Sequence, residues 1–541
     1  MIRQKERDTL KKRVEWGEKI NMEEKCGKKK AIKAEGIIYG LIFLLALFLR
    51  VYRLNDLPYG IHMDEAGMGY DAYSLANCGL DRYYKFYPVY FINFGGGQSV
   101  LYGYSCAFLL KFFKLSVTLL RTPAVISGMM TWLFGTLLIK ENIGRRAGIA
   151  GSLLLAVCPC FILISRLGMD CFWFSGMASV SLYCLTKAIQ AGKSRKATVL
   201  YVTAGVLLGI SLYTYALSWL VIPLFLMITI LYLLYEKKIT WLQIAGMGVP
   251  LALLAAPLIA LLIINTFKLP EIATVHFTIP RLPEYRGAEV SLKNVINNIP
   301  KLFQALFFYD EWRYNSVLTW FSMYVLSVPF SIYGMMIHAK DLKKELERRE
   351  CTGRTVVWFW VIAQICMGLC IEGPNVNKLN GVYLGLLFFT VLGLKTCLEN
   401  ILSEKGKRIF ISGTVAVYVI FAVSFIQYYF TQYTQETHPL YLFCDTYEDI
   451  LENWKDVIGD KTVYSDSSYI FYALGKEISP MELQLVEKGS KSRDNVQFGL
   501  PEEVDENGFY LLFWNQSEAE TLAENGFTIE EAGKFTIAYK N

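Results

Sequence analysis

Long apolar segments separated by short polar ones dominate the chain between residues 36 and 427. An apolar segment of about 20 residues is long enough to cross the hydrocarbon core of a bilayer as a helix. The sequence therefore predicts an all-α polytopic membrane protein with about eleven spanning helices. The expected spans are residues 36–53, 118–139, 146–166, 171–190, 198–215, 217–235, 240–265, 316–337, 355–371, 378–396 and 408–427.

Basic residues gather in every second loop, which predicts one topology. Residues 1–35 hold twelve Lys or Arg, and basic groups recur at 140–146, 193–196, 236–238, 340–354 and 395–408. Because basic loops stay in the cytoplasm, the N-terminal tail is expected there. The protein is then a multi-pass protein of the cell (plasma) membrane whose C-terminal part is extracytoplasmic.

Residues 98–115 are apolar, yet we expect them not to cross the membrane. They contain Gly, Ser, Tyr and two Lys, with apolar residues at helical spacing. If they crossed, every later basic loop would fall outside the cell. An amphipathic helix in the membrane interface, within the first external loop, agrees with both observations.

The composition changes after about residue 428. The chain becomes acidic and polar, with β-rich runs such as KTVYSDSSYIFYAL and GFYLLFWN. This predicts a small extracytoplasmic α/β domain. The expected organisation is a basic cytoplasmic tail at 1–35, a transmembrane domain at 36–427 and a soluble domain at 428–541.

Composition excludes several other classes of protein. Charged residues make up 19% of the 541 residues, against about 25% in soluble domains. Most of the twelve cysteines lie in apolar runs, which predicts neither a disulfide framework nor a metal site. The basic tail suits an anionic membrane surface, and we expect no nucleic-acid partner.

Three acidic residues stand beside predicted spans on the external side. Asp64 and Glu65 open the segment GIHMDEAGMGYDAYSL, and Asp170 lies in ISRLGMDCFWFSG. Charge beside lipid is costly unless it faces water or a site. The alternatives are that Asp64 and Glu65 cap a helix, and that Arg166 forms an ion pair with Asp170 within one helix.

Two cations break the positive-inside pattern. Arg121 and Lys378 lie at the external ends of their spans, and the loop at 268–315 adds His276. Long basic side chains can reach lipid headgroups without further function. They can also bind a phosphate held at the membrane surface.

The segments MDEAGMGYDAYSL, FKLSVTLLRTPAVISG and GRRAGIAGSLLLAVCPCFILISRLGMD, in this order, resemble a known family. It is that of the GT-C-fold glycosyltransferases that use polyprenyl-phosphate sugars. The chain is similar to the dolichyl-phosphate-mannose protein mannosyltransferases and the lipid A aminoarabinose transferases. The resemblance covers residues 36–235 well and the later spans more loosely. Gly95–Ser99 replace a Pro-Pro pair that these relatives usually have.

The resemblance implies roles for individual residues. Asp64 matches the catalytic acid, with Glu65 beside it, and Asp170 matches a second acid. Arg121 and Lys378, with Arg166, would hold the donor phosphate. Apart from the resemblance, Tyr70 and His276 are candidates for contact with substrate because of their places in the two long external loops.

The expected activity is transfer of a sugar from a polyprenyl-phosphate donor to an extracytoplasmic acceptor, which is a protein, a lipid or a cell-envelope glycan. Asp64 would be the general base. No cofactor is firmly implied, and a divalent metal stays open. Two other functions stay open as well: a flippase or transporter of lipid-linked glycans, and a polysaccharide polymerase. A transporter would carry charges near the bilayer midplane, and inverted repeats.

Overall fold

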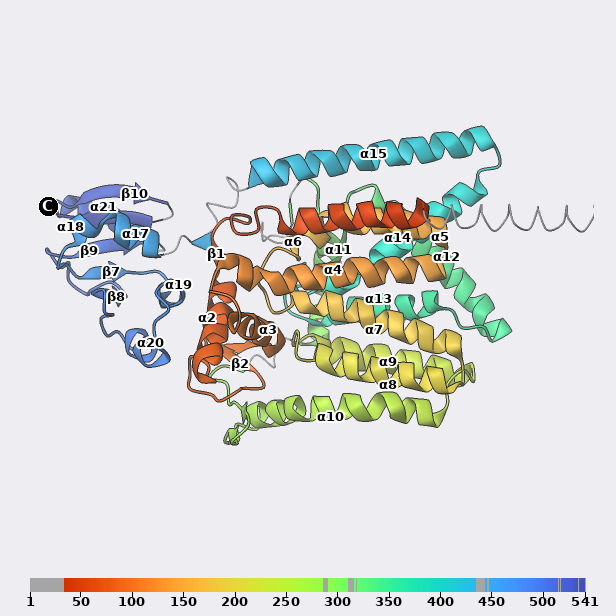
Figure 1. Ribbon diagram of the computed structural model, residues 1–541, viewed down its shortest axis with the longest axis horizontal. Coiled ribbons are helices and arrows are strands. Elements are labelled where there is room, and N and C mark those ends of the chain that lie inside the picture. The colour runs from red at the N-terminus through yellow and green to blue at the C-terminus, as the bar shows by residue number, and fades with distance from the viewer. Residues whose placement is uncertain are drawn as a thin grey trace, which may run out of the picture.

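The computed structural model describes residues 34–285, 290–309, 316–317, 319–433, 443–444, 447–513, 515, 517–533 and 535–540. Long helices lie side by side in a bundle, and a small domain of helices and strands stands at one end of it (Figure 1). The bundle helices are Ala34–Val51, α4 (Val117–Asn142), α5 (Arg145–Val157), α6 (Pro159–Leu163), α7 (Phe172–Ala191), α8 (Arg195–Ser211), α9 (Ser218–Tyr235), α10 (Trp241–Thr266), α12 (Ser327–Arg348), α13 (Gly353–Cys370), α14 (Tyr383–Asn400) and α15 (Glu404–Thr431).

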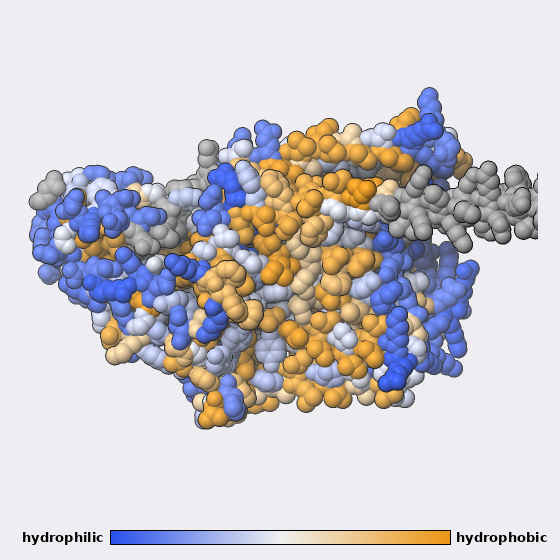
Figure 2. All heavy atoms as spheres, viewed as in Figure 1, coloured by the Kyte–Doolittle hydropathy of each residue, from blue (hydrophilic) through white to orange (hydrophobic). Residues whose placement is uncertain are grey.

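Every predicted span corresponds to helix in the described part of the chain. Seven of these helices are long and apolar enough to cross a membrane: Ala34–Val51, α4, α9, α10, α13, α14 with the preceding turn, and α15. The other four predicted spans correspond to α5 with α6, α7, α8 and α12. Figure 2 shows apolar side chains over the flank of the bundle and polar ones at both ends. The prediction of an all-α polytopic membrane protein is confirmed.

Glycines let neighbouring helices touch through their backbones. A Cβ atom on Gly334 of α12 would collide with the carbonyl oxygen of Phe389 in α14, and one on Gly393 would collide with that of Phe330. Between helices in lipid, close packing replaces the hydrophobic driving force. These two glycines therefore hold α12 against α14.

The span predicted at 316–337 was wrong in position. Residues 319–326 form turns, and α12 begins at Ser327 and runs through the polar segment at 340–348 that was expected to be a loop. Pro329 lies in the first turn of α12, where a missing N–H costs nothing. Side-chain pairs such as Asp341 with Lys344, at 3.4 Å, support the polar end of the helix.

The span predicted at 146–166 is interrupted between α5 and α6. Cys158, which precedes Pro159, has ψ 134°, the extended backbone expected before a proline. The guanidinium of Arg50 donates to the carbonyl oxygens of Leu155 and Ala156 at 3.0 and 3.4 Å. This buried arginine therefore satisfies carbonyls that the break leaves without helical partners.

The loop after the first span folds over one end of the bundle. It contains β1 (Ile61–His62), α2 (Met63–Cys78), the hairpin of β2 (Phe91–Asn93) with β3 (Gly96–Gln98), and α3 (Val100–Leu110). With 11 residues, α3 is too short to cross a bilayer, which takes about 20. It packs against α2 and α4, which confirms that residues 98–115 do not form a span.

A second long connection follows α10. It contains the hairpin of β4 (Ile272–Ala273) with β5 (Thr278–Ile279), the turn η2 (Leu292–Asn294) and α11 (Val295–Phe307). Val89 in the first loop donates its N–H to the carbonyl oxygen of Thr278 at 2.9 Å. The two connections are therefore joined.

The C-terminal domain is a small α/β unit, as predicted. A five-stranded sheet has the order β10-β11-β9-β7-β8, in which β7 is parallel to both β8 and β9. The domain comprises β6 (Phe443–Cys444), α17 (Tyr447–Asn453), α18 (Lys455–Ile458), β7 (Val463–Ser465), α19 (Tyr469–Gly475), α20 (Pro480–Glu487), β8 (Val496–Phe498), β9 (Phe509–Leu512), α21 (Glu518–Glu524), β10 (Thr528–Ala532) and β11 (Phe535–Tyr539).

This domain rests on the loop that follows the first span. Strand β6 pairs with β1, and α19 packs against α2. The hydroxyl of Tyr70 donates to the carbonyl oxygen of Ile478 at 2.9 Å, and that of Tyr73 to Glu477 at 3.1 Å. The domain therefore covers one side of α2, at one end of the bundle (Figure 1).

Candidate active site

The N-terminus of α2 is capped by His62 and Glu65. The backbone N–H of Asp64 donates to Nδ1 of His62 at 3.1 Å, and the N–H of His62 donates to Oε2 of Glu65 at 3.4 Å. Burial lowers the pKa of His62, which favours the neutral ring that this contact needs. The cap is thus made by His62 and Glu65, and the side chain of Asp64 points elsewhere.

Asp64 is directed toward the β2–β3 hairpin. Nδ2 of Asn93 donates to Oδ1 of Asp64 at 3.0 Å, and 37% of the Asp64 side chain is exposed. The next acid, Glu65, has no exposed side-chain surface. Of the two adjacent carboxylates, Asp64 is the one that is exposed to solvent.

Glu65 and Arg121 form a buried ion pair. Nε of Arg121 lies 3.0 Å from Oε1 of Glu65, and the N–H of Gly168 donates to the same oxygen at 2.8 Å. The remaining Arg121 donors go to the carbonyl oxygens of Leu54, Pro58 and Gly60. The structure thus places Arg121 against the segment that joins the first span to α2.

Arg166 holds the same segment from the other side. Its Nη2 donates to the carbonyl oxygens of Tyr52, Arg53 and Leu57, and its Nη1 donates to that of Leu49. The guanidinium also lies over the rings of Tyr429 and Phe430. The donors of both arginines are directed at protein groups.

Asp170 stands beside α3, joined to the same hairpin as Asp64. The backbone N–H of Ser99 donates to Oδ2 of Asp170 at 3.0 Å, and that of Cys171 donates to Oδ1 at 2.8 Å. Desolvation raises the pKa of Asp170 to about 7, although the Ser99 hydrogen bond lowers it; the charge of Asp64 raises it further. The structure therefore brings Asp64 and Asp170 together at one end of the bundle.

The turn before α14 packs on both sides of Asp170. Asn377 contacts the sulfur of Met169 at 3.7 Å, and Nδ2 of Asn380 donates to the carbonyl oxygen of Cys171 at 3.0 Å. Lys378 lies between these two asparagines, and its ammonium donates to the carbonyl oxygen of Glu372 at 2.6 Å. Lys378 is thus on the turn that supports Asp170.

Tyr70 and His276 lie in different surroundings. Tyr70 is fully buried against the C-terminal domain, and His276 is exposed in the turn of the β4–β5 hairpin. The structure places Tyr70 in the contact between the first loop and that domain. Arg286, also in the external loop of the sequence, lies outside the described residues.

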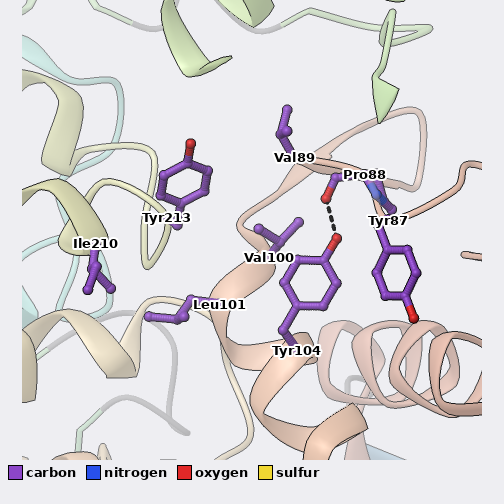
Figure 3. Close-up of a pocket in the computed structure, with 8 residues that line it drawn as sticks. All are labelled: Tyr87, Pro88, Val89, Val100, Leu101, Tyr104, Ile210 and Tyr213. Atoms are coloured by element: carbon purple, nitrogen blue, oxygen red, sulfur yellow. Dashed lines mark hydrogen bonds between the residues drawn. The ribbon is translucent and has the colours of Figure 1, made fainter. Parts of the chain in front are cut away.

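An apolar cavity of about 260 Å³ opens beside α3. Figure 3 shows side chains from the first loop, from α3 and from the end of α8 around it. Its lining residues are Tyr87, Pro88, Val89, Val100, Leu101, Tyr104, Ile210 and Tyr213. Val100 follows Ser99, which binds Asp170, so the cavity begins one residue from the acidic site.

Sequence reasoning missed three residues of this site: Asn93, which donates to Asp64, Arg82, which donates to Asn93, and Asp71, which forms an ion pair with Arg82. Asp71 lies two helical turns after Asp64, a spacing that could have placed both on one face of α2. Arg82 and Asn93 follow no recognisable pattern. Among the residues that the structure describes, no group of three or more His, Cys, Asp or Glu side chains could hold a metal ion.

Comparison with solved structures reveals similar folds. ArnT from Cupriavidus metallidurans in the apo state aligns with a TM-score of 0.58 at 11% identity, covering 94% of this chain and 98% of that chain. The same protein bound to undecaprenyl phosphate aligns with a TM-score of 0.54 at 11% identity, covering 93% and 97%. The archaeal oligosaccharyltransferase AglB from Archaeoglobus fulgidus, in complex with an inhibitory peptide and a dolichol-phosphate, aligns at 0.49 with 12% identity, covering 94% and 74%.

No protein-family model matches the sequence, and neither does any curated protein. The alignment with ArnT extends over nearly the whole of both chains, through the bundle and the C-terminal domain. The fold expected from the resemblance is therefore confirmed: the chain has the GT-C fold.

Proposed function

We propose that this protein transfers a sugar from a polyprenyl-phosphate donor to an acceptor at the membrane surface. One observation carries the proposal: the reachable carboxylate of Asp64 and the carboxyl group of Asp170 lie at the same end of the bundle, and an apolar cavity begins next to them. The ArnT structure with undecaprenyl phosphate, which has a similar fold, supports this donor class.

The chemistry requires a base and a stabilised leaving group. Asp64 accepts the proton of an acceptor hydroxyl, whose oxygen forms a bond to the anomeric carbon of the sugar. The bond between that carbon and the phosphate oxygen breaks, and polyprenyl phosphate leaves as an anion. Asp170, when ionised, stabilises the positive charge that develops on the sugar.

We assign the donor phosphate to Lys378 rather than to the two arginines. Arg121 and Arg166 are fully buried, and their donors are directed at carbonyl oxygens, at Glu65 and at Tyr429. Lys378 is only partly buried and lies on the turn that packs against both neighbours of Asp170. A lysine binds phosphate as a point charge with three donors.

The apolar cavity suits the isoprenoid part of the donor. Its lining is almost entirely apolar, and it lies beside α3, which is expected in the membrane interface. Burial of apolar surface contributes about 25 cal/mol per Å². The first isoprene units next to the phosphate would occupy this cavity while the sugar reaches Asp64.

The test is a transfer assay on the purified protein in lipid nanodiscs. Labelled undecaprenyl-phosphate and dolichyl-phosphate sugars are supplied with a panel of protein, lipid and glycan acceptors, and products are separated by mass. We expect one donor class to give a labelled product, and Asp64→Asn to lower the rate by about 10²–10⁴-fold.

The matched control is Asp56→Asn, an exposed acid in the same external segment. It should leave the rate unchanged. Transfer by Asp64→Asn at the wild-type rate would refute Asp64 as the base. Movement of intact lipid-linked sugar across the bilayer without any new glycosidic bond would refute transferase activity and identify a flippase.

A further inference from the structure

Four polar side chains form a chain of contacts along one face of α2. Asp64 and Asp71 stand seven residues apart on this helix, so they share a face. Arg82, from the loop after α2, and Asn93, at the end of β2, lie between them. The contacts run from Asp71 to Arg82, then to Asn93 and to Asp64.

Arg82 is held firmly by Asp71. Nε and Nη2 of Arg82 donate to Oδ1 and Oδ2 of Asp71 at 3.0 and 2.7 Å, and neither side chain is exposed. The backbone N–H of Arg82 also donates to Oδ1 of Asp71, at 3.0 Å. This buried two-point pair leaves the guanidinium in one orientation.

The orientation of the Asn93 amide follows from its two neighbours. A guanidinium only donates hydrogen bonds, and a carboxylate only accepts them. Oδ1 of Asn93 accepts from Nη2 of Arg82 at 3.2 Å, and Nδ2 donates to Oδ1 of Asp64 at 3.0 Å. If the amide were flipped, its NH₂ group would face the donors of Arg82 and its oxygen would face the carboxylate of Asp64. Only one orientation of the amide is therefore stable.

Gly67 makes room for these contacts. A Cβ atom at this position would lie 2.7 Å from Nη2 of Arg82 and 2.8 Å from Oδ1 of Asn93. The side chains of Arg82 and Asn93 meet directly above Gly67, in the space that a larger side chain at this position would fill. Gly67 is therefore needed for space.

We infer that Asn93 is a positioning residue, which holds Asp64 by one carboxylate oxygen so that the other can accept the proton of the acceptor. Arg82, Asp71 and Gly67 keep Asn93 in place. The inference rests on the proposed function, in which Asp64 is the base. A base that is free to rotate loses the alignment on which its rate contribution depends.

The test compares Asn93→Ala and Asn93→Asp with the wild-type protein in nanodiscs. The probe is the labelled undecaprenyl-phosphate sugar, or its dolichyl counterpart, with which the wild type forms product. We expect Asn93→Ala to lower kcat by about 10- to 100-fold, with KM for the donor changed less than about twofold. Asn77→Ala, which removes an exposed amide from the same helix, should change neither.

Asn93→Asp separates positioning from folding. It keeps the shape of the side chain and an acceptor for Arg82, but it presents a second carboxylate to Asp64. We expect kcat to fall at least as far as in Asn93→Ala near neutral pH, and to recover as the pH falls, since a protonated Asp can donate. If Asn93→Ala does not fold, wild-type kcat in Asn93→Asp overturns the inference.

A double-mutant cycle completes the test. In an Asp64→Asn background, Asn93→Ala should cause no further loss, because the residue acts through Asp64. A loss of the same factor in both backgrounds would show a structural role and overturn the inference. Normal kcat in Asn93→Ala with inactive Asp64→Asn also overturns it, and leaves the proposed function standing. A fully active Asp64→Asn would instead remove the proposed function.

Discussion

The guanidinium of Arg121 lies 3.0 Å from the carboxylate of Glu65, and neither side chain is exposed to solvent. Both residues were expected to act directly on the substrate, as phosphate ligand and catalytic acid. In the structure each is the other's partner, and together they tie α2 to α4 and to Gly60. We therefore predict that the pair serves to hold the N-terminus of α2, and with it Asp64, in place.

Removing one member of this pair should destabilise the fold. Arg121→Ala leaves the Glu65 carboxylate buried without its cation, which typically costs about 3–5 kcal/mol. We expect a lower unfolding temperature in detergent for Arg121→Ala and also for Glu65→Gln. The exposed pair of Arg53 with Asp56 offers a control, since Asp56→Ala should change the unfolding temperature very little. Weaker donor binding with an unchanged unfolding temperature would instead restore the phosphate role of Arg121.

The pH dependence of stability should carry a contribution from Asp170. Desolvation raises the pKa of Asp170 to about 7 in the folded protein, well above the usual range of an aspartate, so the folded state binds the proton more tightly. Stability from this group is complete below about pH 4 and is lost as the pH rises to about 7. We expect the unfolding temperature of the wild type to fall more between pH 5 and pH 7.5 than that of Asp170→Asn. Identical slopes for the two proteins would contradict the raised pKa.

Filling the apolar cavity should weaken the use of long-chain donors. Leu101→Trp places a large ring among the side chains shown in Figure 3. Since each buried CH₂ contributes about 0.8 kcal/mol, excluding two such groups raises KM for the donor by about tenfold. Leu253→Trp, on the exposed surface of α10, should have no such effect. An equal rise in KM for a donor with a very short chain would argue against this location for the isoprenoid.

Contact between α2 and the C-terminal domain should depend more on Tyr70 than on Tyr73. Both hydroxyls donate to carbonyl oxygens of that domain, but only Tyr70 is fully buried. Tyr70→Phe leaves the carbonyl of Ile478 without this donor, which costs about 1–3 kcal/mol. Limited proteolysis of the C-terminal domain should be faster in Tyr70→Phe than in Tyr73→Phe. Equal rates would indicate that the contact does not depend on burial of this hydroxyl.

Hydrophobic pattern and loop charge predicted most of the bundle, because lipid imposes length and polarity on each span. The same physics predicted that residues 98–115 do not cross the membrane, and α3 there has only 11 residues. The position of α12 was predicted poorly, because the helix continues through a polar segment beyond the apolar run. The break at Cys158 is set by the following proline, and Arg50 supports it from a distant segment.

Charged side chains at one end of the bundle were predicted, but their partners were not. Arg121 and Arg166 donate largely to backbone carbonyls, which have no signature in a sequence. Asn93 meets Asp64 across 29 positions, through a hairpin whose three glycines give no directional signal. A sequence pattern can place an acidic residue at a surface. Which of two adjacent acids, Asp64 or Glu65, is exposed depends on these distant contacts.

The contact of the C-terminal domain with α2 restricts how many times the chain between them can cross the membrane. Two segments that touch outside the lipid are on the same side of the membrane, so the chain between them crosses an even number of times. Ten crossings fit between Cys78 and Tyr447: α4, α5 with α6, α7, α8, α9, α10, α12, α13, α14 and α15. Counting α3 as well would make the number odd and separate the two partners. A single tertiary contact thus checks the entire path of the intervening chain.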